Sequence, residues 1–377
     1  METIDRIVWL QRKYLAALDC RFAVFVPVLL ALLLNGCSSV SYYGQLVEGQ
    51  VRLLSARKPV AEVIADPRRD PRLREHLRRS QAARAFATEH LHLPNNRSYT
   101  LYADLGRPFV VWNVFATGEF SLTPVSHCFP VAGCVAYRGY YSQSAARGDA
   151  ALQKLQGLDV YVSGVEAYST LGWFDDPIMS SMLHWGDERL ATLIFHELAH
   201  QRFYVKDDSE FNESYATFVE QEGTRQWRGA QGLPPADATL GKEVDQFTRL
   251  VLDTRARLIK LYAQPLSPGA MRVAKQAEFE RLRQRYALLK SSQWGGAAPF
   301  DSWINAPMNN AKLLPFGLYD QWVPAFAAVF RQVHGDWPAF FIEVERLGRL
   351  PADERKAALV RLAAINPDQT PPPDVGP

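Results

Sequence analysis

Two histidines and a glutamate fall within one five-residue stretch, His196-Glu197-Leu198-Ala199-His200. Histidines four positions apart project from the same side of an α-helix, so both imidazoles can bind one metal ion. Two imidazoles suit zinc, and the glutamate between them can serve as general base toward a metal-activated water. The alternative is a pair of core histidines bonded to the backbone. Because the surrounding sequence predicts a helix that is apolar on nearly every side, burying these polar groups is costly unless a metal satisfies them.

A catalytic zinc site needs a third protein ligand and an open fourth position. Glu213 lies near the start of a second predicted helix, which runs to about Glu222 and is expected to end at Gly223. From there its carboxylate can point back at the histidine pair, so we predict one Zn²⁺ held by His196, His200 and Glu213. The competing carboxylates are Glu210, Glu220 and Glu222. Glu210 is expected to cap its helix, and Glu220 is alternatively placed to hydrogen-bond a ligand histidine.

The elements that must position these residues are mostly helical. Asp187 is the expected N-cap of the metal-binding helix. Upstream, runs rich in β-branched and aromatic residues predict short antiparallel strands at 98–102, 109–116, 119–125 and 159–163. Helices are predicted at 42–56, 72–92, 243–263, 271–290, 319–333 and 339–347, with the third and fourth forming an antiparallel hairpin. The expected fold class is therefore α+β and mainly α-helical, with a small antiparallel sheet before the metal-binding helix and a helical C-terminal half.

The N-terminal segment predicts export. A basic stretch precedes an apolar run at residues 22–34, which is too short to span a membrane comfortably but fits a signal peptide. Leu34-Asn35-Gly36-Cys37 resembles a bacterial lipobox, which implies cleavage after residue 36 and acylation of Cys37. An ordinary signal peptide or a short buried helix is the alternative. The serine after Cys37 implies sorting to the periplasmic face of the outer membrane.

Composition narrows the class of protein further. The 377 residues carry a net charge of +2 and are 47% hydrophobic, which argues for a globular chain and against nucleic-acid binding. We expect residues 1–36 to be the signal, 37–365 to form one domain and 366–377, rich in proline, to be disordered. Of four cysteines, Cys128 and Cys134 remain to pair in an oxidising compartment. A second metal site that includes His127, or a catalytic thiol, is the alternative.

The pattern from His196 to His200, followed by Asn-Glu-x-x-Ala, resembles the gluzincin class of zinc peptidases, whose third ligand is a glutamate on the next helix. The spacing to Glu213 is shorter than in most gluzincins, and Thr217 stands where the thermolysin-like pattern has an acid. The chain more closely resembles a family of bacterial lipoproteins described as putative or predicted aminopeptidases. The blocks that carry this resemblance are residues 119–122 with 128–135 and 137–140, residues 195–201 with 211–222, and residues 309–311 with 335–337.

The resemblance implies a gluzincin-like zinc peptidase core acting on peptides. Candidate donors to the oxyanion are Tyr137, Arg138, Tyr140, Tyr215 and Tyr319. Glu119, on a predicted strand, is a candidate for binding the substrate's free amine. The predicted function is a zinc aminopeptidase with Glu197 as general base. The alternatives are a zinc endopeptidase of the cell envelope and a non-catalytic zinc lipoprotein, against which Glu197 counts because a structural site needs no base.

Overall fold

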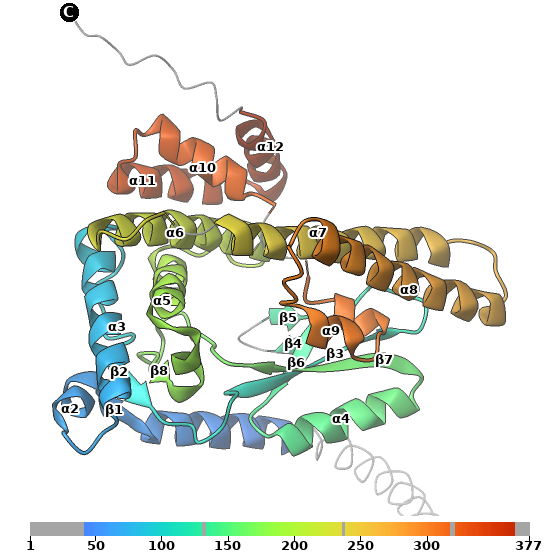
Figure 1. Ribbon diagram of the computed structural model, residues 1–377, viewed down its shortest axis with the longest axis horizontal. Helices are drawn as coiled ribbons and strands as arrows, with labels where there is room; N and C mark the ends of the chain where they lie inside the picture. Colours follow the sequence, from blue (N-terminus) through green and yellow to red (C-terminus); the bar gives the residue numbers. More distant parts are fainter. Residues whose placement is uncertain (1–40, 130–132, 236–237, 317–320, 366–377) are drawn as a thin grey trace, which may run out of the picture. The chain divides into compact units, whose positions relative to one another are not determined.

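The computed structural model describes residues 41–129, 133–235, 238–316 and 321–365 (Figure 1). The chain divides into two compact units, residues 1–55 and residues 56–377. The first unit is described only over a helix at residues 41–55. No helix in the described ranges is both long enough and apolar enough to cross a membrane. The predicted signal segment, Cys37 and the C-terminal tail lie outside the described residues.

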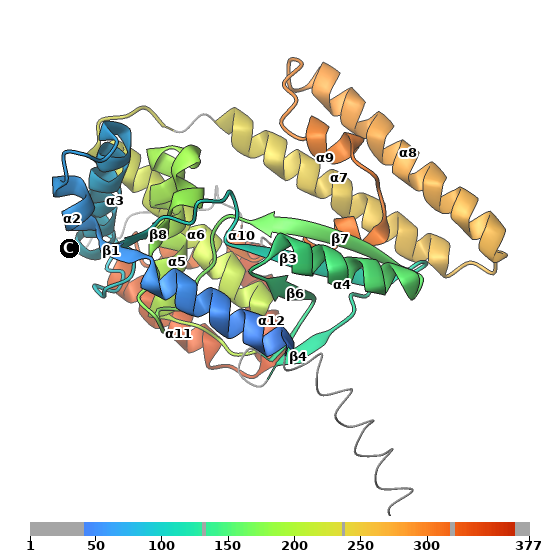
Figure 2. The same cartoon turned by 90° about the horizontal axis from the view of Figure 1, so that it is seen from below.

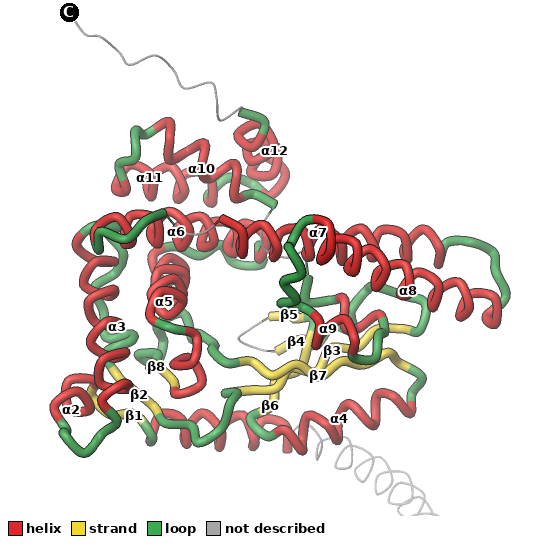
Figure 3. Tube along the Cα trace, in the orientation of Figure 1, coloured by secondary structure: helices red, strands yellow, loops and turns green. Residues whose placement is uncertain are grey.

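Three small β-sheets lie among the helices of the second unit (Figure 3). The first contains β1 (Arg57–Pro59), β2 (Leu101–Ala103) and β8 (Ile178–Met179). The second has the order β6 (Tyr137–Tyr140), β3 (Val111–Gly118), β7 (Leu158–Val165) and is antiparallel throughout. The third is the hairpin of β4 (His127–Phe129) and β5 (Gly133–Val135). The predicted fold class, α+β and mainly helical, is confirmed.

The strand predicted at residues 119–125 is wrong. The chain turns at Glu119, directly after β3, and only an isolated bridge joins Thr117 to Pro124. The buried amide of Asn310 explains the turn, because its Nδ2 donates to the carbonyls of Glu119 and Ser121 at 2.9 Å each. A side chain from far along the sequence thus takes the place of a strand partner.

Helices α3 (Pro71–Glu89), α5 (Asp187–Arg202) and α6 (Ser209–Ala230) pack against one another, and α5 carries the two histidines. α5 buries its apolar residues almost completely, as the sequence predicts. Asp187 is not its N-cap: that position is Gly186, whose φ of 83° favours glycine. The Asp187 carboxylate instead contacts Nδ1 of His76 at 2.5 Å and Arg79 at 3.2 Å. It therefore joins α5 to α3.

α6 does not end at Gly223, contrary to the sequence prediction, but continues for two further turns to Ala230. A Cβ at residue 223 would lie 2.7 Å from the Leu91 side chain and 3.2 Å from Phe195. Glycine is therefore present because α6 crosses close to its neighbours, and its low helix propensity is outweighed by the surrounding packing. The same close approach brings α6 alongside α5.

The C-terminal helices α10 (Val323–Gln332), α11 (Trp337–Gly348) and α12 (Ala352–Ala363) pack near the other side of α6 (Figure 1). Aromatic rings fill the contact. Phe211 and Phe326 have centroids 5.2 Å apart, and Phe218 and Phe340 likewise. Tyr215 stacks on Phe340 at 6.3 Å. α6 is thus held between α5 and this C-terminal group.

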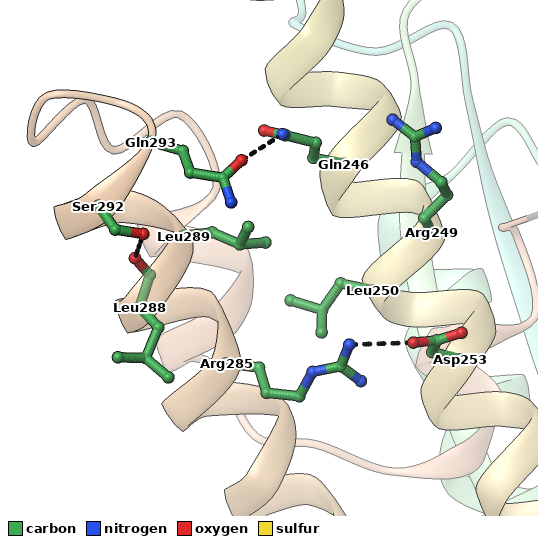
Figure 4. A pocket seen from close by; sticks show the side chains of 9 residues that line it. All are labelled: Gln246, Arg249, Leu250, Asp253, Arg285, Leu288, Leu289, Ser292 and Gln293. Carbon is green, nitrogen blue, oxygen red and sulfur yellow. Dashed lines mark hydrogen bonds and ion pairs between the residues drawn. The ribbon is translucent and has the colours of Figure 1, made fainter.

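The predicted antiparallel hairpin is present as α7 (Ala238–Tyr262) and α8 (Pro268–Ser292). Phe247 on α7 stacks on Phe300 at 3.9 Å, within an apolar cluster that also covers α9 (Asp301–Asn305). Figure 4 shows the open end of the hairpin, a hollow of about 290 Å³ bridged by Gln246 to Gln293 and by Arg285 to Asp253. α4 (Gln143–Leu155), which the sequence analysis does not predict, packs on the β6-β3-β7 sheet (Figure 2).

Candidate metal centre

Three side chains from two helices converge on one point. His196 and His200 of α5 face Glu213 of α6, and their nearest donor atoms all lie within 4.8 Å of one another. Nε2 of His196 is 3.1 Å from Nε2 of His200, and Oε2 of Glu213 is 3.3 Å and 3.7 Å from these two nitrogens. Bonds of about 2.0–2.2 Å to a tetrahedral zinc ion place neighbouring ligand atoms about 3.3–3.6 Å apart. The residues therefore fit a single ion of that size.

The turn between the two helices fixes this geometry. Asn212, fully buried, directly precedes Glu213. Its Nδ2 donates to the Val205 carbonyl at 2.7 Å, and its Oδ1 accepts from the Val205 backbone N–H at 2.8 Å. The Asp208 side chain caps α6 by accepting from the Phe211 N–H. These bonds set where α6 begins, and so where Glu213 points.

The surroundings of His196 favour positive charge. Its Nδ1 lies 2.9 Å from Oε2 of Glu220, which is on the same face of α6 as Glu213, about two turns further along the helix. Burial alone would lower the pKa of His196, but hydrogen bonds to Glu213 and Glu220 raise it to about 10. Burial would likewise raise the pKa of Glu213, yet its hydrogen bonds to the two histidines hold it at about 2. Two carboxylates that stabilise a cationic imidazole this strongly also stabilise a bound cation.

Glu197 has a different environment from Glu213. Burial raises its pKa, against the opposing influence of both histidines. The hydroxyl of Ser169 lies close enough to Glu197 to lower the pKa of the carboxyl in turn. A carboxylate whose pKa is raised toward neutrality suits proton transfer better than one held far below it.

Ser169 belongs to a tightly bonded loop between β7 and β8. The buried carboxylate of Asp176 accepts from the hydroxyls of Ser169 and Thr170 at 3.1 Å and 2.7 Å, and from the Thr170 N–H at 2.9 Å. In the same loop, a Cβ at Gly172, where φ is 81°, would lie 3.1 Å from the side chain of Gln201. The loop therefore lies against the end of α5 and holds Ser169 beside Glu197.

Two tyrosines lie near Glu213. Burial raises the pKa of Tyr137, on β6, and the Glu213 charge raises it further. Burial and Glu213 have the same effect on the pKa of Tyr204, whose ring centroid is 6.1 Å from that of His200. The sequence analysis names Tyr137 but misses Tyr204 and Ser169. Tyr204 could have been found from its spacing, four residues after His200, whereas nothing in the sequence around Ser169 marks it as a neighbour of Glu197.

The remaining predicted substrate-binding residues lie elsewhere. Glu119 accepts two bonds from the Arg272 guanidinium, at 2.6 Å and 2.9 Å, which gives no support to a role in binding a substrate amine. On β6, Arg138 and Tyr140 alternate with Tyr137 and so face away from it, and Arg138 is 3.5 Å from Asp149 of α4. Tyr215 is buried among phenylalanines. Tyr319 lies outside the described residues.

Cys128 and Cys134 form a disulfide across the β4–β5 hairpin. Neither is therefore a free thiol or a thiolate ligand. Among the residues that the structure describes, no group of metal-binding side chains other than the one at His196 gathers closely enough to hold an ion. This leaves the second metal site, considered with His127, without support in the described part of the chain.

Comparison with known protein families matches residues 41–359 to the family described as "Putative aminopeptidase". The chain belongs to this family. The match covers α5, α6 and the C-terminal helices that pack on α6, so the three candidate metal ligands lie inside the matched region. Comparisons with curated proteins and with solved structures give no match.

Proposed function

We propose that this protein is a zinc-dependent aminopeptidase with a gluzincin-like core. The observation that carries the proposal is the triangle of ligand atoms from His196, His200 and Glu213. Glu197 lies in the same helical turn of α5, between the two histidines in sequence. Family membership supports peptide hydrolysis. Two imidazoles and one carboxylate are the ligands that a catalytic zinc ion takes, with a fourth position open. When bound, zinc would polarise a peptide carbonyl and make a water molecule more acidic.

The protein's own residues divide the remaining chemistry. Glu197 takes the proton of the attacking water and passes it to the nitrogen of the departing amine. Glu220 holds the His196 ring by accepting from Nδ1, so that Nε2 keeps its lone pair for the metal. The phenols of Tyr137 and Tyr204, both close to Glu213, are the best-placed donors for the oxyanion. Ser169 steadies the Glu197 carboxylate.

We also propose that the mature chain begins at Cys37 and is anchored by lipid in the bacterial cell envelope, on the periplasmic face of the outer membrane. The apolar run at residues 22–34 and the lipobox-like residues that follow it support this. Incorporation of labelled palmitate that disappears in Cys37→Ser is the expected result. Retained label in that variant would refute the anchor.

The metal and the base are tested by a matched set of variants. The purified protein is expected to contain one equivalent of zinc by mass spectrometry. Glu213→Gln should lose most of that zinc, because a direct ligand is gone, whereas Glu197→Gln should keep the zinc and lose peptidase activity. Full activity in a zinc-loaded Glu197→Gln protein would exclude Glu197 as the general base.

The position of cleavage separates the proposal from an endopeptidase. Peptides with a free N-terminus and the same peptides with an acetylated N-terminus are incubated with the protein, and the products are identified by mass spectrometry. An aminopeptidase releases one residue from the free form and leaves the acetylated form intact. Internal cleavage of both forms would replace the aminopeptidase assignment with an endopeptidase.

A further inference from the structure

β7 leaves one of its edges open. It pairs with β3 on one side only, because it is the last strand in the order β6-β3-β7. In an antiparallel ladder, main-chain groups point to alternate sides along the strand. The Ala116 carbonyl of β3 accepts from Val125, on the side away from β7. Its partner Val160 therefore points its own main chain outward, and the Val160 carbonyl accepts from the Asn309 side chain at 2.9 Å.

The direction of the main-chain groups alternates in the same way along the rest of β7. Val162 and Gly164 must also direct their N–H and C=O groups outward, and the structure shows no partner for these groups among the described residues. An edge with unpaired main-chain groups is a template for another strand. Asn309 closes the edge at Val160, so the open part begins at Val162.

A groove follows this edge. It has a volume of about 530 Å³ and lies between β7, α4 and residues 302–312. The groove is lined by three basic side chains, Arg147, Lys154 and Lys312, and by no acidic one. Arg147 and Lys154 are exposed, lie two turns apart on the same face of α4, and form no ion pair in the described part of the chain.

Lys312 adds a positive charge that the fold does not neutralise. Its side chain is 2% exposed, and its ammonium donates to the carbonyls of Trp303 at 2.5 Å, and of Ala306 and Pro307 at 3.4 Å each. No carboxylate pairs with it among the described residues. Burial lowers its pKa to about 8, with a smaller contribution from Arg283. Because the ammonium N–H groups of Lys312 all have carbonyl partners, Lys312 can act on a bound ligand only through its electrostatic field. Direct contacts with a ligand must therefore come from Arg147 and Lys154.

We propose that the open edge of β7 and the basic groove beside it bind an extended, acidic peptide segment by strand addition. Val162 and Gly164 would supply the main-chain bonds, and Arg147 and Lys154 would pair with the carboxylates. This surface is distinct from the metal centre. Tyr137, which lies near Glu213, is on β6, the strand at the opposite edge of the sheet. β6 and β7 are two strand spacings apart, which is roughly 10 Å. The proposal does not depend on the peptidase assignment.

The test uses the purified full chain and a hexapeptide of alternating valine and glutamate, labelled with fluorescein at its N-terminus. Binding is followed by fluorescence anisotropy, and chromatography verifies that the peptide stays intact. The lysine counterpart of the peptide should not bind. N-methylation of alternate residues, which removes main-chain donors on one edge, should abolish binding when the methylated edge is the one facing β7.

Two protein variants test the two halves of the surface. Charge reversal at both Arg147 and Lys154 to glutamate should weaken binding by about tenfold or more, whereas Lys260→Glu, an exposed lysine on α7, should not. Val162→Pro removes one outward N–H without touching the β3 ladder, and should weaken binding by a similar factor, with Val162→Ile as its control. Circular dichroism verifies that each variant keeps its fold. A charge-reversal variant that does not fold is replaced by the double alanine variant, and the N-methylated peptides decide the main-chain test if Val162→Pro does not fold.

Three results would overturn the proposal. The first is unchanged affinity in the charge-reversal variant or in a folded Val162→Pro protein. The second is equal affinity for the lysine peptide. The third is displacement of the peptide by inorganic phosphate together with indifference to N-methylation at either edge, which would assign the groove to a small anion. Loss of zinc or of peptidase activity has no bearing on these measurements, so the two proposals fail separately.

Discussion

Replacing one carboxylate oxygen of Glu220 by an amide nitrogen tests whether the metal site depends on residues beyond its ligands. In Glu220→Gln the carboxylate that faces Nδ1 of His196 at 2.9 Å becomes a neutral amide of the same shape. The ring loses its negatively charged partner, and the neutral amide oxygen that remains is a weaker acceptor for the Nδ1 N–H that orients the ring. Changes of this kind cost about 10–100-fold in metal affinity, which corresponds to about 1.4–2.7 kcal/mol of binding free energy. Glu213→Gln, which removes a ligand itself, should cost considerably more.

The assay is a competition titration of zinc between the protein and a fluorescent chelator. Glu222→Gln is the matched control: it changes the same residue type on the same helix, but its carboxylate contacts Arg225 and Gln226 rather than a histidine. Wild-type affinity in Glu220→Gln, with weakened affinity in Glu213→Gln, would refute the role of Glu220. If Glu222→Gln weakened binding equally, the effect would belong to α6 in general.

Three further predictions follow from contacts outside the metal centre. Glu119→Gln should leave the kinetic constants on free-amine peptides within about twofold, because its carboxylate is engaged by a guanidinium; a large rise in KM would restore it as the amine-binding residue. Replacing Cys128 and Cys134 by serine should lower the free energy of unfolding in urea by about 2 kcal/mol, since the cross-link closes a short loop; an unchanged unfolding midpoint would contradict this. Gly348→Ala should destabilise the fold by about 1–3 kcal/mol in the same assay, because its Cβ would meet the Phe203 ring at close range; equal or greater stability would show that the ring moves aside.

The sequence predicts that His196, His200 and Glu213 come together, and the structure places them side by side, because their relation is local. One helical turn relates His196 to His200, and a short connection brings the next helix, with Glu213, back alongside. Helix periodicity and spacing therefore carry the information. The same local reasoning finds the α7–α8 hairpin. The identity of the ion stays a prediction.

What the sequence does not predict depends on contacts between distant segments. Ser169 reaches Glu197 only because Asp176 folds its loop against α5. The segment after Gly118 has the composition of a strand, yet Asn310 turns it. Glycine at position 223 is typical of the end of a helix, yet α6 continues through it and Gly223 lies where the helix passes close to its neighbours. In the second and third cases tertiary packing overrides a local preference that is worth at most about 1 kcal/mol.

The position of α6 between α5 and the C-terminal helices has a consequence for biosynthesis. The ligand Glu213 and the aromatic residues Phe211 and Phe218 are on the same helix, and those rings are covered by Phe326 and Phe340. A nascent chain that has not yet reached Val323 contains all three candidate ligands but leaves one face of α6 exposed to water. If these residues bind the metal as proposed, metal capture should wait until the chain is complete, and truncated products should be metal-free.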